Sequence, residues 1–497
     1  MMARGFTLAQ RFSMLALLAV AAHGASETCC NQLAKALAGG KVLQSSDSNY
    51  TAENQKHWSL TSILTPACIL LPESSSDVST AVKILVKNSC KFAVRGGGHT
   101  TNPGWANTNS GVLISLSKLV NVEVSEDNKS VYVGAGNRWG DVYSKTGERG
   151  VTVTGGRLSS VGVSGFLLGG GLSFLMHSKG FGADNVLSYE IVLANGAIST
   201  VTKESSQDLF KALKGGSGNF GIVTSFKLQT YPINDVYAGN LQYSPDQYNT
   251  LFSLMETYAR KGIESDPKTH IISNFIYYPS QSIEAANFYS FYPEPITAPP
   301  PATKPFFDVP TISNTVKVKT MKEALDELSV GSEVKQRYDF RAYTVRADAK
   351  LFKKLFDTWH STTKKLNGTS GWASTIVYQV ISNSMIHASN MKGGNVLGLE
   401  PAPNPRIIVS YLFAWSLEED DKKVHAAIDK LITDSKDIAK SQGRLDRYIY
   451  LNYAGSNQQP IQSYGPTQVN FLRNVKSKYD PNNVFEKLSC GGFKIPT

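Results

Sequence analysis

The chain has few features that would place it outside ordinary globular proteins. Only 18% of its 497 residues are charged, and its five cysteines include no Cys-x-x-Cys pair, which disfavours a zinc site or a thioredoxin-like redox centre. Beyond residue 24, no apolar run approaches the length of about 18 residues that a membrane-spanning helix requires. Because 41% of the residues are hydrophobic, the chain can bury a core, which excludes disorder, collagen and coiled coil. Its length favours two domains.

Several catalytic signatures are absent as well. The sequence contains no Gly-x-x-x-x-Gly-Lys-Ser/Thr phosphate loop and no His-Glu-x-x-His zinc motif. Three residues separate Gly136 from Gly140, whereas a dinucleotide-binding Gly-x-Gly-x-x-Gly has two at that place. The segment Gly215-Gly-Ser-Gly-Asn219 ends in Asn where a nucleophile elbow needs Gly. The absence of these motifs disfavours kinases, Rossmann dehydrogenases, zinc proteases and serine esterases.

The first 24 residues have the pattern of a secretory signal peptide. Arg4 and Arg11 precede an apolar run over residues 12–22, and the small-residue site Ala22-His-Gly24 ends it. A buried N-terminal helix is the alternative. We therefore expect a secreted protein with no membrane segment. In an oxidising compartment one or two disulfides are expected, with an odd thiol left over, and spacing does not decide the pairing among Cys29, Cys30, Cys68, Cys90 and Cys490.

The surface chemistry gives two further expectations. Three Asn-x-Ser/Thr sequons, at Asn49, Asn128 and Asn367, are consistent with secretion and glycosylation. The net charge of +10 invites a nucleic-acid partner, but the densest basic cluster, Lys350 to Lys354, has helical spacing and acidic neighbours. A solvated helix face explains this cluster, so no nucleic-acid partner is expected.

Hydrophobic periodicity divides the chain into a part with short predicted elements and a part with longer ones. Residues 66–232 alternate short elements: a helix capped by Ser74, a hairpin turning at Asn195-Gly196, and strands over residues 91–94, 112–116, 131–133, 190–201 and 221–228. Beyond Pro232 the elements are longer. Helices are predicted at about 245–261, 348–365 and 418–440, interleaved with strands at 271–278, 337–345, 373–381 and 407–415. This second pattern predicts a sheet with helices on one face.

Glycine is concentrated in four clusters, all within residues 95–221. They are Arg95-Gly-Gly-Gly-His99, Gly134 to Gly140, Gly162 to Gly171, and Gly215 to Gly221. Each follows a predicted strand or lies in a turn, where missing side chains let backbone amides approach a ligand closely. Any one cluster is explained by a tight turn. Together the four favour a ligand that contains a diphosphate.

The chain resembles a flavoenzyme family at these clusters. Arg95-Gly-Gly-Gly-His99, Gly156-Arg-Leu-Ser-Ser-Val161-Gly and Gly169-Gly-Gly-Leu-Ser-Phe resemble the FAD-linked oxidases of the vanillyl-alcohol oxidase superfamily, which share a PCMH-type FAD-binding domain. Within it, the chain is most similar to the berberine-bridge-enzyme-like branch, in particular to secreted fungal members. The resemblance continues to the tail Lys478-Tyr-Asp-Pro481 and covers essentially the whole mature chain.

The resemblance implies an α+β fold with an interrupted cofactor domain. Residues 25–232 and 441–497 would form the FAD-binding domain, and residues 233–440 an inserted substrate domain in which helices cover an antiparallel sheet. FAD is the implied cofactor, no metal is expected, and we expect a monomer. The implied cofactor-binding residues are Arg95, Gly96, Gly97, Gly98, His99, Gly156, Ser160, Val161, Gly162, Gly165, Gly169, Gly170, Gly221, Ile222, Val223, Asn452 and Tyr453.

Three positions carry the implied flavin chemistry. In the family the histidine after the glycine run is bonded to the flavin, and His99 has that position; a turn histidine bonded to the diphosphate is the alternative. Doubly linked members add a bond from a cysteine, but Leu158 stands there and no second link is expected. A small valine over the flavin goes with oxidase behaviour in the family, and Val161 matches it. The alternative is that Val161 is simply a buried strand residue.

Removal of hydride from a carbon that bears OH or NH also requires a base. Family members commonly use a tyrosine on the returning strand, and Arg447-Tyr-Ile-Tyr-Leu-Asn-Tyr453 supplies three. Strand alternation would put Tyr448, Tyr450 and Asn452 on one face and Tyr453 on the other. We expect Tyr450 to be the base, with Asn452 and Tyr453 nearer the flavin; a plain aromatic strand is the alternative.

Substrate contacts are expected from the inserted sheet, where Tyr378, Gln379 and Tyr411 lie on strands that could face the flavin. We take Gln379 as the candidate. The expected function is a secreted oxidase that takes hydride from a sugar, alkaloid or other metabolite and reduces dioxygen to hydrogen peroxide. The alternatives are a dehydrogenase with another electron acceptor and a non-catalytic flavin- or sugar-binding protein.

Overall fold

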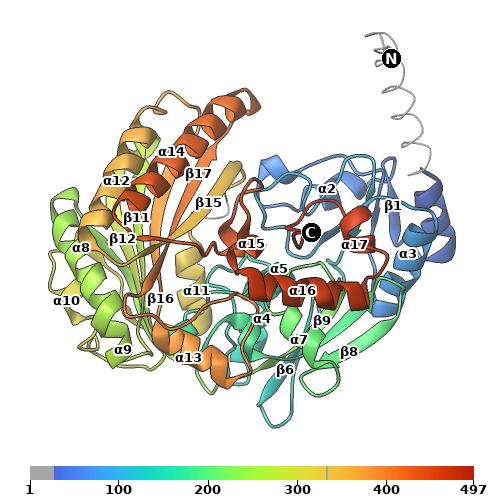
Figure 1. Ribbon diagram of the computed structural model, residues 1–497, viewed down its shortest axis with the longest axis horizontal. Helices are drawn as coiled ribbons and strands as arrows, with labels where there is room; N and C mark the ends of the chain where they lie inside the picture. The colour runs from blue at the N-terminus through green and yellow to red at the C-terminus, as the bar shows by residue number, and fades with distance from the viewer. Residues whose placement is uncertain (1–26, 332–333) are drawn as a thin grey trace, which may run out of the picture.

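The computed structural model describes residues 27–331 and 334–497, so the predicted signal peptide lies outside the described residues. Three sheets organise the chain (Figure 1). Strands before residue 232 form a four-stranded and a five-stranded sheet, and a nine-stranded sheet contains the strands from Asp235 to Asp446. The mixture of helices and largely antiparallel sheets confirms the α+β class.

The four-stranded sheet has the order β1-β2-β4-β3, with β4 (Val112–Ser115) parallel to both neighbours. Its other strands are β1 (Val42–Gln44), β2 (Cys68–Leu70) and β3 (Phe92–Arg95). Helix α3 (Ser75–Lys87) begins where predicted, because the Ser74 side chain accepts a 3.2 Å hydrogen bond from the Asp77 N–H. The strand β3 ends at the first glycine cluster.

The five-stranded sheet is antiparallel, in the order β5-β6-β9-β7-β8. Asn195 and Gly196 form the predicted hairpin turn between β7 and β8, and Gly196 has the positive φ of +80° that this turn requires. The strands are β5 (Val122–Val124), β6 (Ser130–Gly134), β7 (Val186–Leu193), β8 (Ile198–Thr202) and β9 (Gly221–Gln229). Short helices connect them: α4 (Trp139–Gly147), α5 (Val163–Leu168), α6 (Met176–Lys179) and α7 (Gln207–Ala212).

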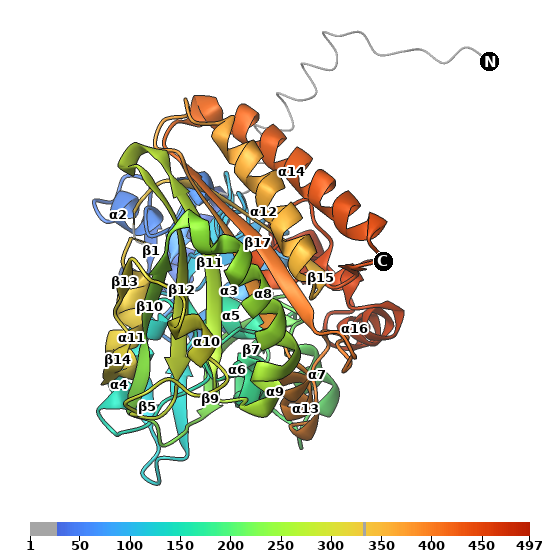
Figure 2. The same cartoon turned by 90° about the vertical axis from the view of Figure 1, so that its left-hand side faces the viewer.

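The nine-stranded sheet is antiparallel throughout, in the order β13-β10-β12-β11-β16-β17-β15-β18 with β14 also paired to β10. Its strands are β10 (Asp235–Tyr243), β11 (His270–Tyr278), β12 (Ile283–Tyr292), β13 (Ser313–Asn314), β14 (Lys317–Thr320), β15 (Arg337–Arg346), β16 (Ala373–Ile381), β17 (Arg406–Trp415) and β18 (Leu445–Asp446). Helices α8 (Tyr248–Thr257), α12 (Ala349–Lys364) and α14 (Asp421–Ser441) cover one face, as predicted (Figures 1 and 2).

Alternation along these strands sends neighbouring side chains into two different cores. Tyr378 packs in the core beneath the helices, and its hydroxyl donates to the Phe352 carbonyl of α12. Tyr411 lies in that core too, bonded to Ser435 of α14. Both tyrosine side chains therefore point from their strands toward the helix-covered face of the sheet. Gln379, one residue along β16, has the opposite orientation.

The C-terminal segment returns to the first part of the chain. Phe92 N–H of β3 donates to the Leu488 carbonyl, and α16 (Pro466–Tyr479) packs against α7 (Figure 1). The strand predicted over residues 447–453 is wrong: residues 447–450 are irregular and Leu451–Tyr453 form a 3₁₀ helix. The remaining helices are α2 (Tyr50–Asn54), α9 (Ile263–Ser265), α10 (Lys304–Phe307), α11 (Met321–Ser329), α13 (Asn383–Met391), α15 (Pro460–Ser463) and α17 (Val484–Lys487).

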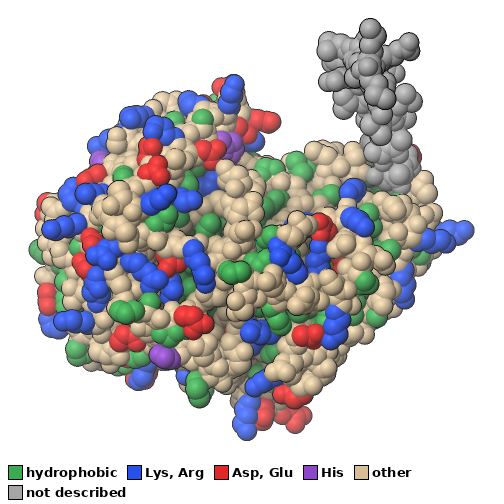
Figure 3. Space-filling view, viewed as in Figure 1, with side chains coloured by type: hydrophobic (Ala, Val, Ile, Leu, Met, Phe, Trp, Pro, Cys, Tyr) green, Lys and Arg blue, Asp and Glu red, His purple; other side chains and the backbone are tan. Residues whose placement is uncertain are grey.

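Disulfides Cys29–Cys90 and Cys30–Cys68 tie residues 27–36 to the first sheet and leave Cys490 as a free thiol. The number of disulfides agrees with the expectation. Within residues 27–331 and 334–497, no helix has the length and apolarity needed to cross a membrane. Basic and acidic side chains are intermixed on the face in Figure 3. On α12, Lys353 pairs with Asp357 at 2.7 Å, as expected of a solvated helix face.

Candidate cofactor and active site

The first and third glycine clusters meet backbone to backbone. A Cβ built on Gly97 would lie 2.3 Å from the Cα of Gly162, so neither position has room for a side chain. The Arg138 guanidinium donates to the Gly97 carbonyl at 3.0 Å, and Trp139 N–H donates to the Val161 carbonyl at 3.0 Å. Three segments distant in the sequence thus form one glycine-lined surface.

Gly96, which precedes Gly97, likewise has no room for a side chain. A Cβ there would lie 2.0 Å from the Ser164 hydroxyl of α5 and 3.3 Å from the Ala135 carbonyl. Ala135 N–H in turn donates to the Thr224 carbonyl of β9. The predicted residues Gly221, Ile222 and Val223 begin this same strand. The Ser217 N–H of the fourth cluster also donates to the Leu168 carbonyl, so contacts link all four clusters.

Arg95 has its side chain turned away from this surface. Its guanidinium is 1% exposed and pairs with Glu53 at 2.5 Å, with further hydrogen bonds to Ser115 and His57. The buried pair holds β3 against α2 and the loop that follows it. These contacts show that Arg95 supports the glycine turn, and its role in binding a cofactor stays a prediction.

His99 follows the glycine run and is held by an aromatic stack. Its ring lies parallel to Trp58 with centroids 4.3 Å apart, and Trp58 stacks in turn on Tyr338 of β15 at 4.0 Å. His99 Nε2 is buried and has no hydrogen-bond partner among the described residues. Burial lowers the His99 pKa to about 4, so the imidazole is neutral at pH 7 and keeps a free lone pair.

Backbone donors at the same turn are also without partners. The N–H groups of Gly97, Gly98 and His99 find no acceptor among the described residues, although Gly97 and Gly98 are buried. The Ser160 hydroxyl, which the sequence also predicted, is buried without a partner there. Buried donors normally have acceptors, so this surface is built for a ligand that supplies them.

Gly156 and Val161 border the same surface. A Cβ on Gly156 would lie 2.4 Å from the Trp139 ring, so the glycine lets the chain pass over that indole. Val161 is half-buried. Gly165 on α5 is exposed and has open space where its side chain would be.

The Gly169 turn contacts the C-terminal tyrosine segment. A Cβ on Gly169 would lie 2.0 Å from the Asn452 amide oxygen, and Gly170 is 3.7 Å from the Tyr450 ring by the same construction. Gly171 N–H donates to the Tyr450 hydroxyl at 3.2 Å, and Asn452 Nδ2 donates to it at 3.1 Å. Burial raises the Tyr450 pKa. Asn452 and Tyr450 are neighbours as expected, although a 3₁₀ helix and not a strand brings them together.

Tyr453 lies beside Tyr450, with the rings edge to face and centroids 4.8 Å apart. Its ring stacks on Phe340 of β15 at 4.6 Å. Its hydroxyl accepts a 2.9 Å hydrogen bond from Arg157, whose same nitrogen donates to the Gln379 amide oxygen at 2.5 Å. The structure thus brings both predicted catalytic residues and Tyr453 to the boundary between the glycine clusters and the nine-stranded sheet.

Sequence reasoning missed Arg157, Trp58 and His270. Arg157 belongs to the Gly156 motif, but that motif was interpreted through its glycines and through Leu158, Ser160 and Val161. Trp58 and His270 lie in no motif, and only tertiary contacts bring them to the site. The local sequence around Trp58 and His270 contains no pattern that would have identified them.

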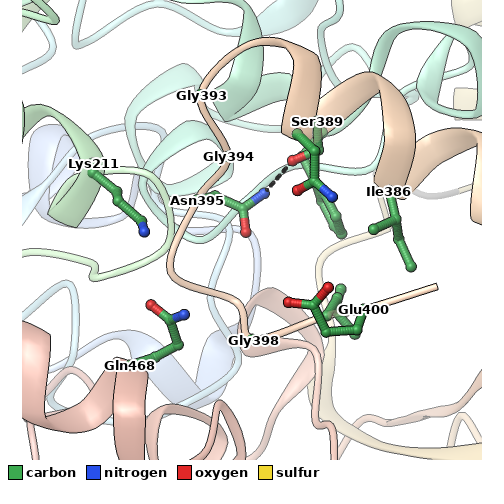
Figure 4. Close-up of a pocket in the computed structure, with 12 residues that line it drawn as sticks. Lys211, Ile386, Ser389, Gly393, Gly394, Asn395, Gly398, Glu400 and Gln468 are labelled. Carbon is green, nitrogen blue, oxygen red and sulfur yellow. Dashed lines mark hydrogen bonds between the residues drawn. The ribbon is translucent and has the colours of Figure 1, made fainter.

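The pocket drawn in Figure 4 lies elsewhere. It has a volume of about 250 Å³ and lies between α13, the loop 393–400, Lys211 of α7 and Gln468 of α16. None of the predicted site residues lines it. Asn395 projects toward Ser389 across one wall, and the two are hydrogen-bonded at 2.9 Å (Figure 4).

The fold and this site define a flavin-dependent oxidoreductase, and comparison with known proteins agrees. Residues 66–202 match the FAD binding domain family. The chain is 32% identical over 478 residues to FAD-dependent monooxygenase drtC of Aspergillus calidoustus, with 94% of this chain and 90% of that protein covered. It therefore belongs to the family of FAD-dependent oxidoreductases that includes drtC.

Solved structures share the whole fold. Xylooligosaccharide oxidase from Myceliophthora thermophila C1 superposes with a TM-score of 0.76 at 20% identity, covering 95% of this chain and 100% of that one. Phl p 4 is similar both as the wild type, a glucose dehydrogenase, and as a variant that is a glucose oxidase. The variant, with Ile-to-Val and Asn-to-His substitutions, has a TM-score of 0.75 at 17% identity, covering 95% and 99%.

Proposed function

We propose that this protein is a secreted oxidase that holds FAD covalently through His99 and oxidises a carbon bearing OH or NH. The observation that carries the proposal is the buried His99 Nε2, which has no partner among residues 27–331 and 334–497, beside a glycine turn whose N–H groups find no acceptor there either. The turn would bind the diphosphate and His99 the ring system. FAD, when bound, takes up the hydride and passes the electrons to dioxygen.

FAD binding and substrate binding are assigned to parts of the chain that contain different sheets. Residues 25–232 and 441–497 would bind FAD, and residues 233–440 would enclose the substrate. Gln379 reaches from the inserted sheet to Arg157 and is our candidate for a substrate contact. The substrate's OH or NH proton passes to the pair formed by Tyr450 and Tyr453, which lies where the two parts meet.

Val161 supports the use of dioxygen. The family associates a small residue at this place with oxidase behaviour, and the oxidase variant of Phl p 4 carries an Ile-to-Val substitution. Relatives such as drtC are named monooxygenases, which would place one oxygen atom in the product. Peroxide release and ¹⁸O incorporation into product distinguish these two outcomes.

Secretion is supported by the covalent structure. Two disulfides are stable mainly in oxidising compartments. Two of the three sequon asparagines, Asn49 and Asn367, are exposed and accessible to glycosylation. Both features agree with the signal-peptide pattern of residues 1–24.

The deciding experiment is acid precipitation of protein made under flavin-replete conditions. The wild-type polypeptide should remain yellow in the pellet, and His99→Ala should release its flavin into the supernatant. The exposed His387 offers a matched control, since His387→Ala should retain the flavin. A colourless wild-type pellet, or flavin retained by His99→Ala, would contradict the proposed attachment.

A further inference from the structure

Arg157 differs from the other buried arginines of the described chain in having no carboxylate partner. Arg95 pairs with Glu53 at 2.5 Å, and Arg341 pairs with Asp339 at 3.0 Å. Arg157 is 8% exposed and forms no ion pair with any described residue. Burying a charge without a counter-charge is costly, so we looked for an anion that comes from outside the chain.

Three uncharged side chains hold the Arg157 guanidinium, and they come from different segments. Its Nη2 donates to Gln379 Oε1 of β16 at 2.5 Å and to Tyr453 Oη at 2.9 Å. Its Nη1 lies 3.1 Å from His270 Nε2 of β11. Burial, and then the charges of His177 and Arg157, lower the pKa of His270 well below its ordinary value, so this ring stays neutral. The Arg157 charge is therefore fixed in position but not neutralised.

His270 adds a second unused donor beside the guanidinium. Because its Nε2 accepts from Arg157, the proton of the neutral ring is on Nδ1. His270 is 1% exposed, and its Nδ1 has no hydrogen-bond partner among the described residues. Buried donors normally have acceptors. The guanidinium and the adjoining imidazole thus share a shortage of acceptors and of negative charge.

These two groups lie on the side of the site that is assigned to the substrate. The partners of Arg157 belong to β11, to β16 and to the 3₁₀ turn Leu451–Tyr453, and none belongs to the glycine clusters. Tyr453 is only half-buried, and its ring stacks on Phe340 of β15 at 4.6 Å. The buried charge is therefore next to an aromatic pair that can contact the body of an organic molecule.

We propose that the substrate is an organic acid and that Arg157 selects it by pairing with a carboxylate or an ionised enol oxygen. This inference rests on the proposed function and narrows its substrate to molecules with a negative charge. The bound acid supplies the anion and the acceptors that Arg157 and His270 lack, while Gln379 and Tyr453 hold the guanidinium in place beforehand. Neutral sugars and cationic alkaloids leave the charge uncompensated and are disfavoured.

Calorimetric binding to the purified holoenzyme tests this charge preference. The probes are hydroxycarboxylates from glycolate to mandelate, and 1,3-cyclohexanedione, which ionises to an enolate near neutral pH. Each is compared with a neutral counterpart, the primary amide of the carboxylate or the methyl ether of the enol. At least one acid should bind the wild type about tenfold or more tightly than its counterpart. Comparison of the carboxylates with the enolate distinguishes the two sources of the anion.

Substitution of Arg157 assigns the preference to this residue. Arg157→Gln should weaken binding of the preferred acid by about 10- to 100-fold and change binding of its neutral counterpart by less than about threefold. Arg157→Lys keeps the charge and should retain part of the preference. Arg341→Gln removes a buried guanidinium that already has a carboxylate partner, and it should leave the preference in place. Circular dichroism and thermal melting verify that each variant is folded.

Four results would overturn the inference. They are equal binding of acids and neutral counterparts by the wild type, no measurable binding of any acid, an equal loss of both affinities in Arg157→Gln, and a loss of flavin in Arg157→Gln with the acid preference unchanged. The third would indicate a packing defect, and the fourth would mean that the charge serves the cofactor. Because binding is measured without turnover, the inference can fail while His99 retains flavin, and it can hold if no oxidase activity is found.

Discussion

Gly97 and Gly162 touch through their α-carbons, so that a Cβ on Gly97 would lie 2.3 Å from the Gly162 Cα. The two residues belong to different glycine clusters, and their contact aligns the turn that ends in His99 with the start of α5. No side chain mediates this contact. The cofactor surface thus depends on the absence of two methyl groups.

Gly97→Ala should prevent this contact and thereby the binding of FAD. The clash is with backbone, which cannot rotate away, so we expect a loss of about 1–3 kcal/mol in the free energy of unfolding together with a low flavin content. Absorbance per polypeptide and chemical denaturation measure both effects. Gly218→Ala is the matched control, since Gly218 is exposed with nothing within 4 Å of its would-be Cβ. Equal flavin contents in the two variants would show that the contact is dispensable.

At Gly165, unlike Gly97, an added methyl group would not clash with the protein. It lies inside α5 and faces open space, so Gly165→Ala alone should stabilise the helix by about 0.5–1 kcal/mol. If FAD covers this position as predicted, the added methyl group will instead lower the flavin content of the purified protein. Flavin absorbance after parallel expression with wild type decides the matter, and unchanged content would remove Gly165 from the cofactor-binding residues.

Val161→Leu should slow reoxidation by dioxygen. A larger side chain over the flavin would obstruct the approach of oxygen, and we expect the rate to fall by about tenfold, or roughly 1.4 kcal/mol in barrier. The protein can be reduced with dithionite and mixed with oxygenated buffer, so no substrate is needed. Unchanged reoxidation would show that Val161 is only a packing residue.

His177 makes stability depend on pH. It is 1% exposed and hydrogen-bonded to Ser382 at 2.9 Å, and burial lowers its pKa to about 3 from an unfolded value near 6.5. Between these values the unfolded chain binds more protons than the folded one. The free energy of unfolding should therefore fall as the pH drops below about 6.5, by up to about 1.4 kcal/mol per pH unit from this group.

Denaturation of wild type and His177→Gln at about pH 7.5 and about pH 5 isolates this contribution, because glutamine can still bond Ser382 but does not titrate. The variant should lose less stability on acidification than the wild type. Equal losses would mean that His177 does not gain a proton on unfolding in this range.

Local sequence patterns predicted much of the fold. Ser74 marked the start of α3, Asn195-Gly196 the hairpin between β7 and β8, and long alternating segments the strands β11, β15, β16 and β17. The prediction over residues 447–453 was wrong because alternating tyrosines imitate a strand. Their hydroxyl and amide contacts with the Gly169 turn favour an irregular chain and a 3₁₀ turn instead.

The sequence by itself determined where the backbone carries no side chains and that the imidazole of His99 follows one such run. Both are properties of a few consecutive residues and need no tertiary contact. Only the tertiary structure decided which side of the nine-stranded sheet Gln379 occupies, which cysteines pair, and which tyrosine receives a guanidinium. Arg157 and Tyr453 are 296 positions apart, and their hydrogen bond arises from the packing of separate segments. A one-dimensional pattern contains no information on such a pairing, because burial and distance are properties of the folded chain.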